Sequence, residues 1–529
     1  KETTVMSADS RSSTEETSPP MEEIRHIRSK YQQSPEATDD LHHVQSHYSN
    51  HDMPATTDEF HEVDADQYLR FSPAQKRLIV AVLSFCSFLA PISSTSILSA
   101  IPEVAETFQT TGSIINASNA LYLAFMGIAA PFWGPFSQVW GRRPIFLTSA
   151  FLFFCFSIGT ALSPNLPAYF IFRILTAFQG TSFLVVGSSA IGDVYEPRAR
   201  GTALASFLSG TLVGPALGPF IGGVIVNFRS WRVIFWLQSA LGGVGTILVF
   251  FLFPETFPNL DKSERIQETK RQKAKFLWAR INPFRVGILL LSNPNLSFAG
   301  LAAGALVWNQ YSLLTPIRYV LNPRFHLTSP ILSGLFYIAP GCGYLVGTFM
   351  GGRWADHTVK KWIRKRGGVR IPEDRLKSCL VFLGIAIPGC VLVYGWTVEK
   401  AVGGIPVPVL AMFLQGVAQL FCFPSLNTYC LDVMQAKGRS AEVVAGNYMC
   451  RYFFAALGSG VVLPAIEVIG VGWFSTLSAF FLIVSGICVW ATTIFGSAWR
   501  EKVDAKDQRK ETEKTQEIPA PLNSEKSEV

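Results

Sequence analysis

Two arginines lie inside long apolar stretches, where a charged side chain is unusual. Arg173 follows Phe170-Ile-Phe, and Arg451 follows Asn447-Tyr-Met-Cys. A charge at the centre of a bilayer costs about 2.5–3.5 kcal/mol on insertion scales, so it normally faces a bundle interior or a water-filled cavity. Because a guanidinium is always charged and carries five donors, either arginine could bind an anionic substrate group or tune a proton-carrying partner. The structural alternative is hydrogen bonding to carbonyls of a neighbouring helix or, for Arg451, snorkelling from a helix end.

Uncharged polar residues occur in several other apolar stretches. Among them are Asn309, Gln310, Gln415 and Asn447. They could line a cavity that holds amphipathic ligands by stacking and a few hydrogen bonds, and hydrogen bonding between helices explains each one singly as well. The few carboxylates lie near the ends of the apolar stretches or in loops. Those near the ends are Asp193, Asp432, Glu442 and Glu467. The residues alone therefore name no proton carrier.

A short charged sequence occurs twice, each time at the end of an apolar stretch. Asp193 begins Asp-Val-x-x-x-Arg-x-Arg, and Asp432 begins Asp-Val-x-x-x-Lys-x-Arg. We expect each acid to pair with the basic residues that follow it, in a gate that forms in one conformation and breaks in another. Exposed pairs add little stability, and ordinary basic loops beside a helix-end acid are the alternative. The gate candidates from this repeat and from Gly352-Arg-Trp-Ala-Asp356 are Asp193, Arg198, Arg200, Asp356, Asp432 and Arg439.

Glycine recurs at every fourth position between residues 210 and 222, and prolines follow two of these glycines. Such spacing gives a helix a smooth face on which another helix packs closely, and proline is tolerated where neighbouring groups re-satisfy the backbone. We expect this helix to pack across two halves of the protein and to slide or bend during switching, with static close packing as the alternative. The motif residues are Gly214, Pro215, Gly218, Pro219, Gly222 and Gly223.

Twelve apolar stretches must position these residues. The 529 residues are 49% hydrophobic and only 16% charged, and a transmembrane helix needs about 20 mostly apolar residues. This composition is typical of a helical membrane protein and not of a soluble enzyme. The net charge of +7 does not indicate nucleic-acid binding, because most basic residues flank the apolar stretches or lie in the tails. The expected spans are 78–98, 115–137, 144–163, 167–190, 202–226, 232–254, 297–319, 330–351, 378–397, 406–430, 442–466 and 471–495.

Basic residues divide the loops into two sets. One set of alternate loops holds most of the Lys and Arg residues, which places these loops and both termini in the cytoplasm. We expect two pseudo-symmetric six-helix halves with a substrate site between them, an arrangement that is typical of transporters. The expected parts are a disordered cytoplasmic tail (1–75), a first half (76–254), a cytoplasmic central loop (255–296), a second half (297–496) and a second disordered cytoplasmic tail (497–529).

Four segments resemble the major facilitator superfamily, and more narrowly its fungal twelve-span drug:proton antiporters. The resemblance covers about residues 75–500. Residues 134–144 resemble the signature of the loop after the second span, and Arg173 resembles the buried arginine of the fourth. Residues 214–223 resemble the antiporter signature of the fifth span, and 447–451 resemble a sequence of multidrug and organic-acid exporters. The loop signature adds the gate candidates Gly134, Gln138, Gly141, Arg142 and Arg143.

The chain departs from the family pattern in two places. The loop signature normally has an acid followed by a basic residue where this chain has Gln138 and Val139. In that family the acid belongs to a charge network that closes the cytoplasmic side, so the network here is expected either to be weaker or to depend on Asp193 and Asp356. The fourth span usually has Gln and Gly shortly after its arginine, where this chain has Thr176-Ala177.

The resemblance implies an all-α secondary transporter of the major facilitator fold. It implies a plasma-membrane monomer that exports drugs, toxic amphiphiles or organic acids by alternating access, with proton antiport. Facilitated export or exchange of anionic metabolites such as carboxylates fits the residues almost as well, and a receptor or scaffold without transport is a third class. The sequence has no phosphate-binding GxxxxGK[ST], nucleophile elbow or Cys/His ligand spacing. It therefore predicts no enzyme, ATP-driven pump, cofactor or metal site.

Overall fold

The computed structural model describes residues 68–196, 199–257, 284–321, 324–325, 335–435 and 439–516. Within these residues all regular structure is helical and no strand is present. Several predictions fall outside the described residues: those for the first 67 residues, for Arg198, for the middle of the central loop (258–283), for Lys437 and for residues 517–529.

The first half contains a long helix at each predicted span. Local sequence sets some of the starts: Ser72 and Gln75 form a capping box before the first helix, and the Asn165 side chain caps the fourth. The elements in order are α4 (Pro73–Thr95), the 3-10 turn η2 (Ser96–Ser99), α5 (Ile101–Thr107), α6 (Gly112–Trp140), α7 (Arg142–Ala161), α8 (Leu166–Val194), α9 (Arg200–Phe228) and α10 (Arg232–Leu252).

The second half is less regular than the first. Its first two helices meet at a bend of 107°, and its last helix is interrupted at Gly470, whose φ of 79° is a conformation that glycine adopts readily. The elements in order are α12 (Phe284–Ser292), α13 (Pro294–Leu314), the π-turn η3 (Ile317–Leu321), α16 (Ile338–Lys365), the 3-10 helix η4 (Pro372–Ser378), the π-turn η5 (Phe382–Ala386), α17 (Ile387–Lys400), α18 (Pro406–Gln435) and α19 (Ser440–Gln516).

Long apolar helices account for most of the described chain. Among the described residues, nine helices are long and apolar enough to cross a membrane, or ten if the bent pair α12 and α13 counts as one span. One of the nine is a 65-residue stretch, Glu442–Lys506, that contains the break at Gly470. The predicted all-helical membrane architecture is confirmed, whereas the predicted number of twelve spans exceeds this count.

Four segments differ from the expected boundaries. α4 begins at Pro73, inside the tail expected over residues 1–75. α16 continues to Lys365, well beyond the expected end at residue 351. Residues 284–292, placed in the central loop, form α12, which buries Leu289 and Leu290 against the bundle. Residues 497–516, placed in a disordered tail, continue α19 as a helix. The extensions of α16 and α19 are polar, so hydropathy alone does not detect them, and local helical propensity favours their continuation. α12 was missed because its nine residues are too few to span a membrane.

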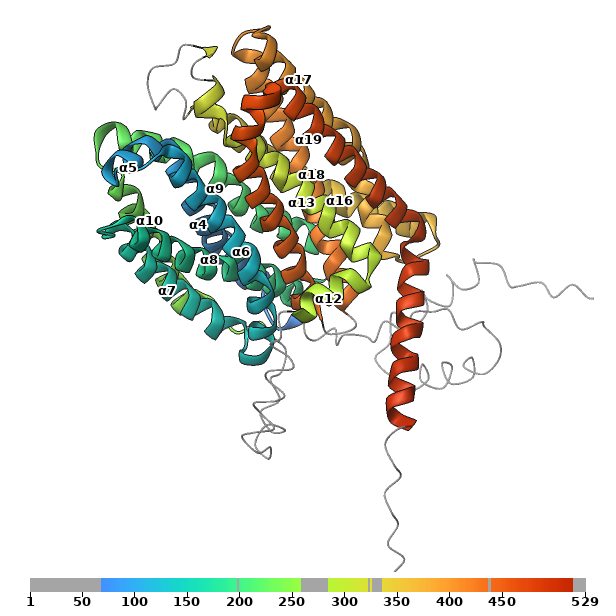
Figure 1. Cartoon of the computed structure of the whole chain (residues 1–529). Helices are drawn as coiled ribbons and strands as arrows, with labels where there is room; N and C mark the ends of the chain where they lie inside the picture. The colour runs from blue at the N-terminus through green and yellow to red at the C-terminus, as the bar shows by residue number, and fades with distance from the viewer. Residues whose placement is uncertain are drawn as a thin grey trace, which may run out of the picture. The chain divides into compact units, whose positions relative to one another are not determined.

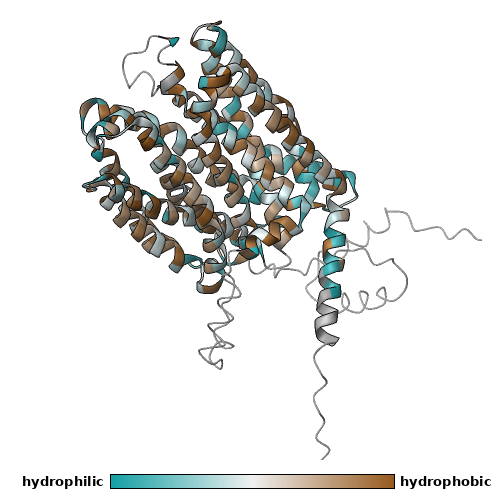
Figure 2. Ribbon diagram, viewed as in Figure 1, coloured by the Kyte–Doolittle hydropathy of each residue, from teal (hydrophilic) through white to brown (hydrophobic). Residues whose placement is uncertain are grey.

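Helix packing brings the two halves together along two seams. α9 of the first half packs against α16, and α6 packs against α19 (Figure 1). Within the first half, α4 lies along α9 and α7 lies along α10. Apolar residues cover most of the helix lengths, and hydrophilic residues cover the projecting end of α19 (Figure 2). This distribution is the one a helix needs when its sides face lipid and its ends face water.

Candidate functional site

Three arginines form ion pairs with Asp432. They lie at the end of the bundle where α7 and α9 begin and where α8 and α18 end, which is here called the basic end. Arg200 reaches Asp432 from α9 of the first half, with 3.0 Å between Nη1 and Oδ1. Arg370 and Arg375 approach from the second half, at 2.6 Å and 3.5 Å from Oδ2. The Asp432 and Arg200 side chains are 3% and 1% exposed, so this ion pair joins the halves away from water.

Asp356 makes a second link between the halves. Its Oδ2 accepts the backbone N–H of Thr202 at 3.1 Å and the Thr202 hydroxyl at 2.7 Å, and its Oδ1 accepts a bond from Arg375 at 3.2 Å. Thr202 lies in the first turn of α9, where backbone N–H groups lack helical partners and a negative charge is favoured. A carboxylate from α16 therefore caps a helix of the other half.

The loop signature forms a separate cluster inside the first half. Arg142 pairs with Asp193 through Nε and Oδ2 at 3.0 Å and donates to the Ser137 hydroxyl at 2.6 Å. The Glu255 carboxylate accepts the backbone N–H groups of Arg142 and Arg143, at 2.9 Å and 3.1 Å. These contacts fix the start of α7 against the ends of α6, α8 and α10.

Two glycines of the loop signature lie where the backbone needs them. Gly141, between α6 and α7, has a φ of 97°, a conformation that side-chain-bearing residues rarely adopt. Gly134 is buried within α6, and Gln138 is half-buried one turn later.

The pairing expected from the Asp-Val repeat is wrong for two basic residues. The carboxylate partner of Arg200 is Asp432 of the other half, not the acid of its own repeat. Arg439, just before α19, pairs with Glu442 in the first turn of that helix, at 2.6 Å, instead of with Asp432. The reason is that Arg200 begins α9, whose start faces the second half, so its side chain extends across the interface.

Several residues of these clusters were missed by the sequence analysis. Arg370 and Arg375 were counted only as positive charges of a basic loop, and Thr202 and Glu255 drew no attention. One signal was present: Pro372-Glu-Asp-Arg375 mixes acids with bases, and this mixture forms the buried helix η4, in which Arg375 is 1% exposed.

Removing the charge of Asp432 should strongly destabilise the protein. Asp432→Asn leaves buried arginines without a counter-charge, and breaking a buried ion pair in this way costs about 3–5 kcal/mol. We expect a clear fall in the unfolding temperature of the purified protein in detergent. The control is Arg324→Gln, which removes an ion pair with Glu399 in which the two side chains are 32% and 29% exposed, and it should cost at most about 1 kcal/mol. Equal melting curves for the two variants would contradict the role of Asp432 as the link between the halves.

Arg173 braces helices of the first half. It donates to the Ser93 carbonyl of α4 at 2.8 Å and to Asn119 of α6 at 3.2 Å. Its guanidinium lies 4.5 Å from the Tyr122 ring centroid and 5.7 Å from that of Phe235. Its Nε has no hydrogen-bond partner among the described residues. These contacts favour the structural alternative for Arg173, in which it holds neighbouring helices together and does not bind a substrate.

Arg451 is placed differently. The residue is 2% exposed, and its guanidinium stacks 4.3 Å from the Phe423 ring centroid and 4.6 Å from that of Tyr448. Its Nε and Nη1 have no hydrogen-bond partner in the described part of the chain. Tyr448 in turn bonds Ser188 of the first half at 3.0 Å. Arg451 is thus a buried cation, next to the contact between the halves, with donors to spare.

The polar residues predicted in the second half are all buried, and three of them, Asn309, Gln415 and Asn447, are only partly satisfied. Gln415, Gln419 and Gln310 form a chain of side-chain hydrogen bonds, at 2.9 Å and 3.2 Å, that joins α18 to α13. Buried polar atoms normally have a partner in the protein or in water. Those that lack one among the described residues include Asn309 Nδ2, Gln415 Oε1, Asn427 Nδ2 and Asn447 Oδ1. This interior therefore has unused hydrogen-bonding capacity for water or a ligand.

The glycine motif of α9 does not pack across the halves, so that expectation is wrong. Cβ atoms at Gly210, Gly218 and Gly222 would overlap atoms of α4 and η2 in the same half. The close approach across the halves comes instead from glycines of α16: a Cβ at Gly352 would lie 2.8 Å from the Cβ of Ala205 on α9. A glycine stripe identifies a smooth face but not the helix that it meets.

A cavity of about 1170 Å³ opens between α6 and α19 at the opposite end of the bundle. It is lined mainly by small and apolar residues of both helices, and its polar side chains include Asn116 and Glu467. The two halves are therefore bonded at the basic end and hollowed between these helices at the other. A volume of this size suits a drug-sized molecule.

Known proteins resemble this chain over most of its length. The family model described as Major Facilitator Superfamily matches residues 83–459. A protein named MFS antiporter QDR3, from Candida albicans, is 25% identical, over 82% of this chain and 79% of that protein. A protein named Efflux pump radE, from Floropilus chiversii, is 28% identical, over 77% of this chain and 78% of that protein.

One solved structure extends the comparison to three dimensions. The human organic anion transporter MFSD10 (TETRAN) superposes with a TM-score of 0.61, over 79% of this chain and 100% of that one. At 16% identity this likeness shows a shared fold.

Proposed function

Because this chain belongs to the major facilitator superfamily, we propose that it exports small organic compounds by alternating access, in exchange for protons. Its family and the names of its relatives make it a membrane transporter and not an enzyme. The export direction and the exchange with protons take their support from the relatives named as an efflux pump and an antiporter.

The asymmetry between the two ends carries the proposal of alternating access. At the basic end, Arg200 bonds Asp432 and Thr202 bonds Asp356 across the halves. Towards the other end a cavity opens between α6 and α19, which remain in contact beside it. A carrier that exposes its site to one side at a time needs such a closed end and such an open end, exchanged between two states.

The membrane arrangement follows from the same proposal. Twelve spans result if α16 counts as a span, if Gly470 divides α19 into two, and if α12 with α13 counts as one. The basic end then lies in the cytoplasm with both termini, because basic loops favour that side. In this arrangement the protein works as a monomer in the plasma membrane, with its open cavity facing outward.

A specific observation favours a second candidate function, export or exchange of organic anions. Arg451 is buried, forms no ion pair among the described residues, and has two unpartnered donor atoms. An unpaired buried cation at the contact between the halves is the counter-charge that a carboxylate would need.

Efflux from loaded cells separates the two functions. Cells expressing the chain are loaded with a cationic dye or a labelled tricarboxylate, and efflux is followed with and without a protonophore. Dye efflux that stops with the protonophore is the expected result for the proton antiporter. Carboxylate efflux that continues with the protonophore would instead establish the anion carrier, and no efflux of either compound would oppose both.

Arg451→Gln provides the matching prediction. If the substrate is an anion, losing its counter-charge should reduce carboxylate efflux by roughly tenfold or more, because a charged hydrogen bond contributes about 1.5–3 kcal/mol. Dye efflux should change much less. Arg451→Lys keeps the charge and is expected to retain part of the carboxylate efflux. Unchanged carboxylate efflux in the Gln variant, at equal protein level, would remove Arg451 from the site.

A further inference from the structure

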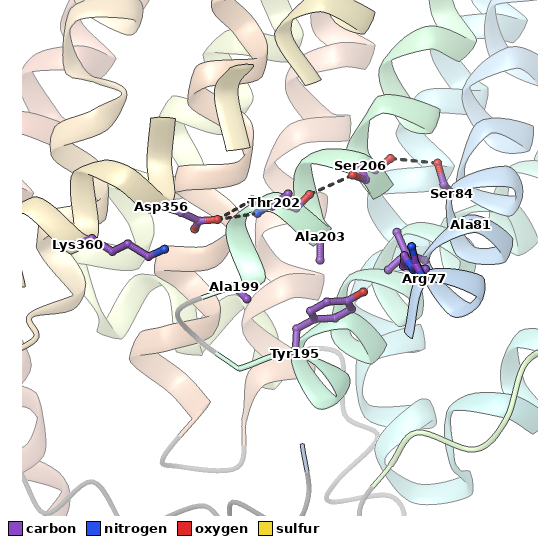
Figure 3. A pocket seen from close by; sticks show the side chains of 11 residues that line it. Arg77, Ala81, Ser84, Tyr195, Ala199, Thr202, Ala203, Ser206, Asp356 and Lys360 are labelled. Atoms are coloured by element: carbon purple, nitrogen blue, oxygen red, sulfur yellow. Dashed lines mark hydrogen bonds between the residues drawn. The ribbon is translucent and has the colours of Figure 1, made fainter. Parts of the chain in front are cut away.

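A groove of about 770 Å³ lies at the basic end, on the side of the bundle where α4, α9 and α16 meet. Figure 3 shows its walls: Arg77 and Ala81 come from α4, Thr202 and Ala203 from α9, and Lys360 from α16. Tyr195, just after α8, lies beneath them. The groove therefore draws its lining from both halves of the protein.

The groove has a cation on each half and apolar residues between them. Arg77 and Lys360 are both exposed, and neither forms an ion pair within the described residues. The one carboxylate in the wall, Asp356, is already bonded to Thr202 and Arg375. The available charge in the groove is therefore positive.

Polar groups that can donate hydrogen bonds also face the groove. Tyr195 has a pKa raised by burial, an effect that the nearby Arg77 opposes, so the phenol stays neutral and keeps its proton. The Ser84 and Ser206 hydroxyls lie deeper along α4 and α9, but each already donates to a backbone carbonyl, of Ser206 and Thr202 respectively, so Tyr195 is the hydroxyl donor left for a ligand (Figure 3). Val80 and Ala81 continue the wall into the apolar part of α4, whose hydrophobic run begins directly after Arg77.

We propose that this groove binds an anionic phospholipid, with the headgroup phosphate between Arg77 and Lys360 and part of an acyl chain along α4. Charge complementarity selects the headgroup, since basic pockets between transmembrane helices on one membrane side bind such lipids. The position selects a lipid over a soluble anion, because the cations stand where the polar end of α4 gives way to its apolar run.

Lipid binding in this groove would favour the conformation in which the basic end is closed. The groove exists only while α16 lies against α9, because its lining comes from both. A ligand that binds one conformation better shifts the population toward it. The lipid would thus act with the Asp356 link to hold the basic end closed.

The experiment measures lipid binding to the full chain, purified and reconstituted in nanodiscs of phosphatidylcholine with or without phosphatidylserine. The variant is Arg77→Gln with Lys360→Gln, and its affinity for a fluorescent phosphatidylserine is compared with that of the original chain. We expect binding about 30-fold weaker, since each surface cation contributes roughly a fivefold factor toward anionic lipid. The increase in unfolding temperature produced by phosphatidylserine should shrink in parallel.

A second double variant provides the control. Lys361→Gln with Arg364→Gln removes the same charge from exposed positions of α16 that do not line the groove, and it should bind phosphatidylserine as the original chain does. An equal loss in both double variants would show a diffuse surface effect and overturn the site. Displacement of the lipid by the same concentration of inorganic phosphate would overturn the choice of a lipid. Neither readout depends on transport, so the site stands or falls separately from the proposed function.

Discussion

Replacing Arg173 with alanine should reduce transport to background. The substitution removes hydrogen bonds to α4 and α6 and the stacking against Tyr122 and Phe235. Bonds to charged groups contribute about 1.5–3 kcal/mol each, and a desolvated cation–π contact contributes up to about 2 kcal/mol. The loss therefore amounts to several kcal/mol in a helix contact that borders the interior. Efflux per molecule of folded protein and the unfolding temperature are the two measurements.

Two further variants test whether the effect depends on the contacts of Arg173: Arg173→Lys and the control Arg232→Ala. Lysine keeps the charge but has no planar fork, so it cannot hold the Ser93 carbonyl and Asn119 together, and transport should remain low. Arg232→Ala also removes a carbonyl bond, at 3.1 Å to Ser163, and a ring contact, at 4.5 Å to Trp231. It is the first residue of α10 and is only half-buried, so efflux should be close to normal. Normal efflux in Arg173→Ala would contradict the bracing role.

Replacing Gly222 with valine should prevent stable folding. A Cβ at this position would overlap the Ser96 carbonyl oxygen, and one at Gly218 would overlap the Thr95 hydroxyl. α9 would have to move away from α4 by roughly 1 Å or more to reach ordinary contact distances of about 3.5 Å. The neighbouring hydroxyl bonds from α4 and η2 to α9 carbonyls, such as Ser99 to Pro219 at 2.5 Å, would break with it.

Gly→Ala substitutions distinguish the effect of close packing on stability from the effect of helix propensity. In an open helical position Gly→Ala gains about 1 kcal/mol, because alanine is the better helix former. A Cβ at Gly389 of α17 meets nothing within 4 Å, so Gly389→Ala should leave stability unchanged or raise it. Gly222→Ala should lower it despite the same gain. The yield of monodisperse protein and its melting temperature measure both, and a stabilised Gly222→Ala would contradict the close contact seen between α9 and η2.

Hydropathy was enough to locate the membrane-length helices of the first half. The six spans expected in the first half each coincide with a helix, because a run of about 20 apolar residues has few other stable conformations in a membrane. Ser72 and Gln75, which cap the first helix, had been assigned to the first tail, because hydropathy does not detect a polar cap. The helical extension of α16 to Lys365 escaped prediction because it is polar, and its stability comes from local propensity and not from hydropathy.

The partners of the charged residues depend on contacts between distant segments. Arg200 and Asp432 are separated by 232 positions in the chain, and their bond exists only because the start of α9 meets the end of α18. The repeat correctly drew attention to both residues but suggested partners next to them in sequence. In the sequence, the Asp356 carboxylate likewise resembled part of a helix-end motif. Its bonds to the first turn of α9 could not be predicted, because they depend on how the two halves pack together.

By itself, the sequence determined that this protein is a helical membrane protein with buried arginines, a glycine-rich helix and basic loops, because hydropathy and charge act locally along the chain. Only the tertiary structure decided that the glycines of α9 meet α4, that Arg173 is bonded on two sides while Arg451 retains free donors, and that Arg77 and Lys360 border one groove. The physical reason is that a helix presents each side chain in a known direction, but the neighbour in that direction is set by how all the helices pack together.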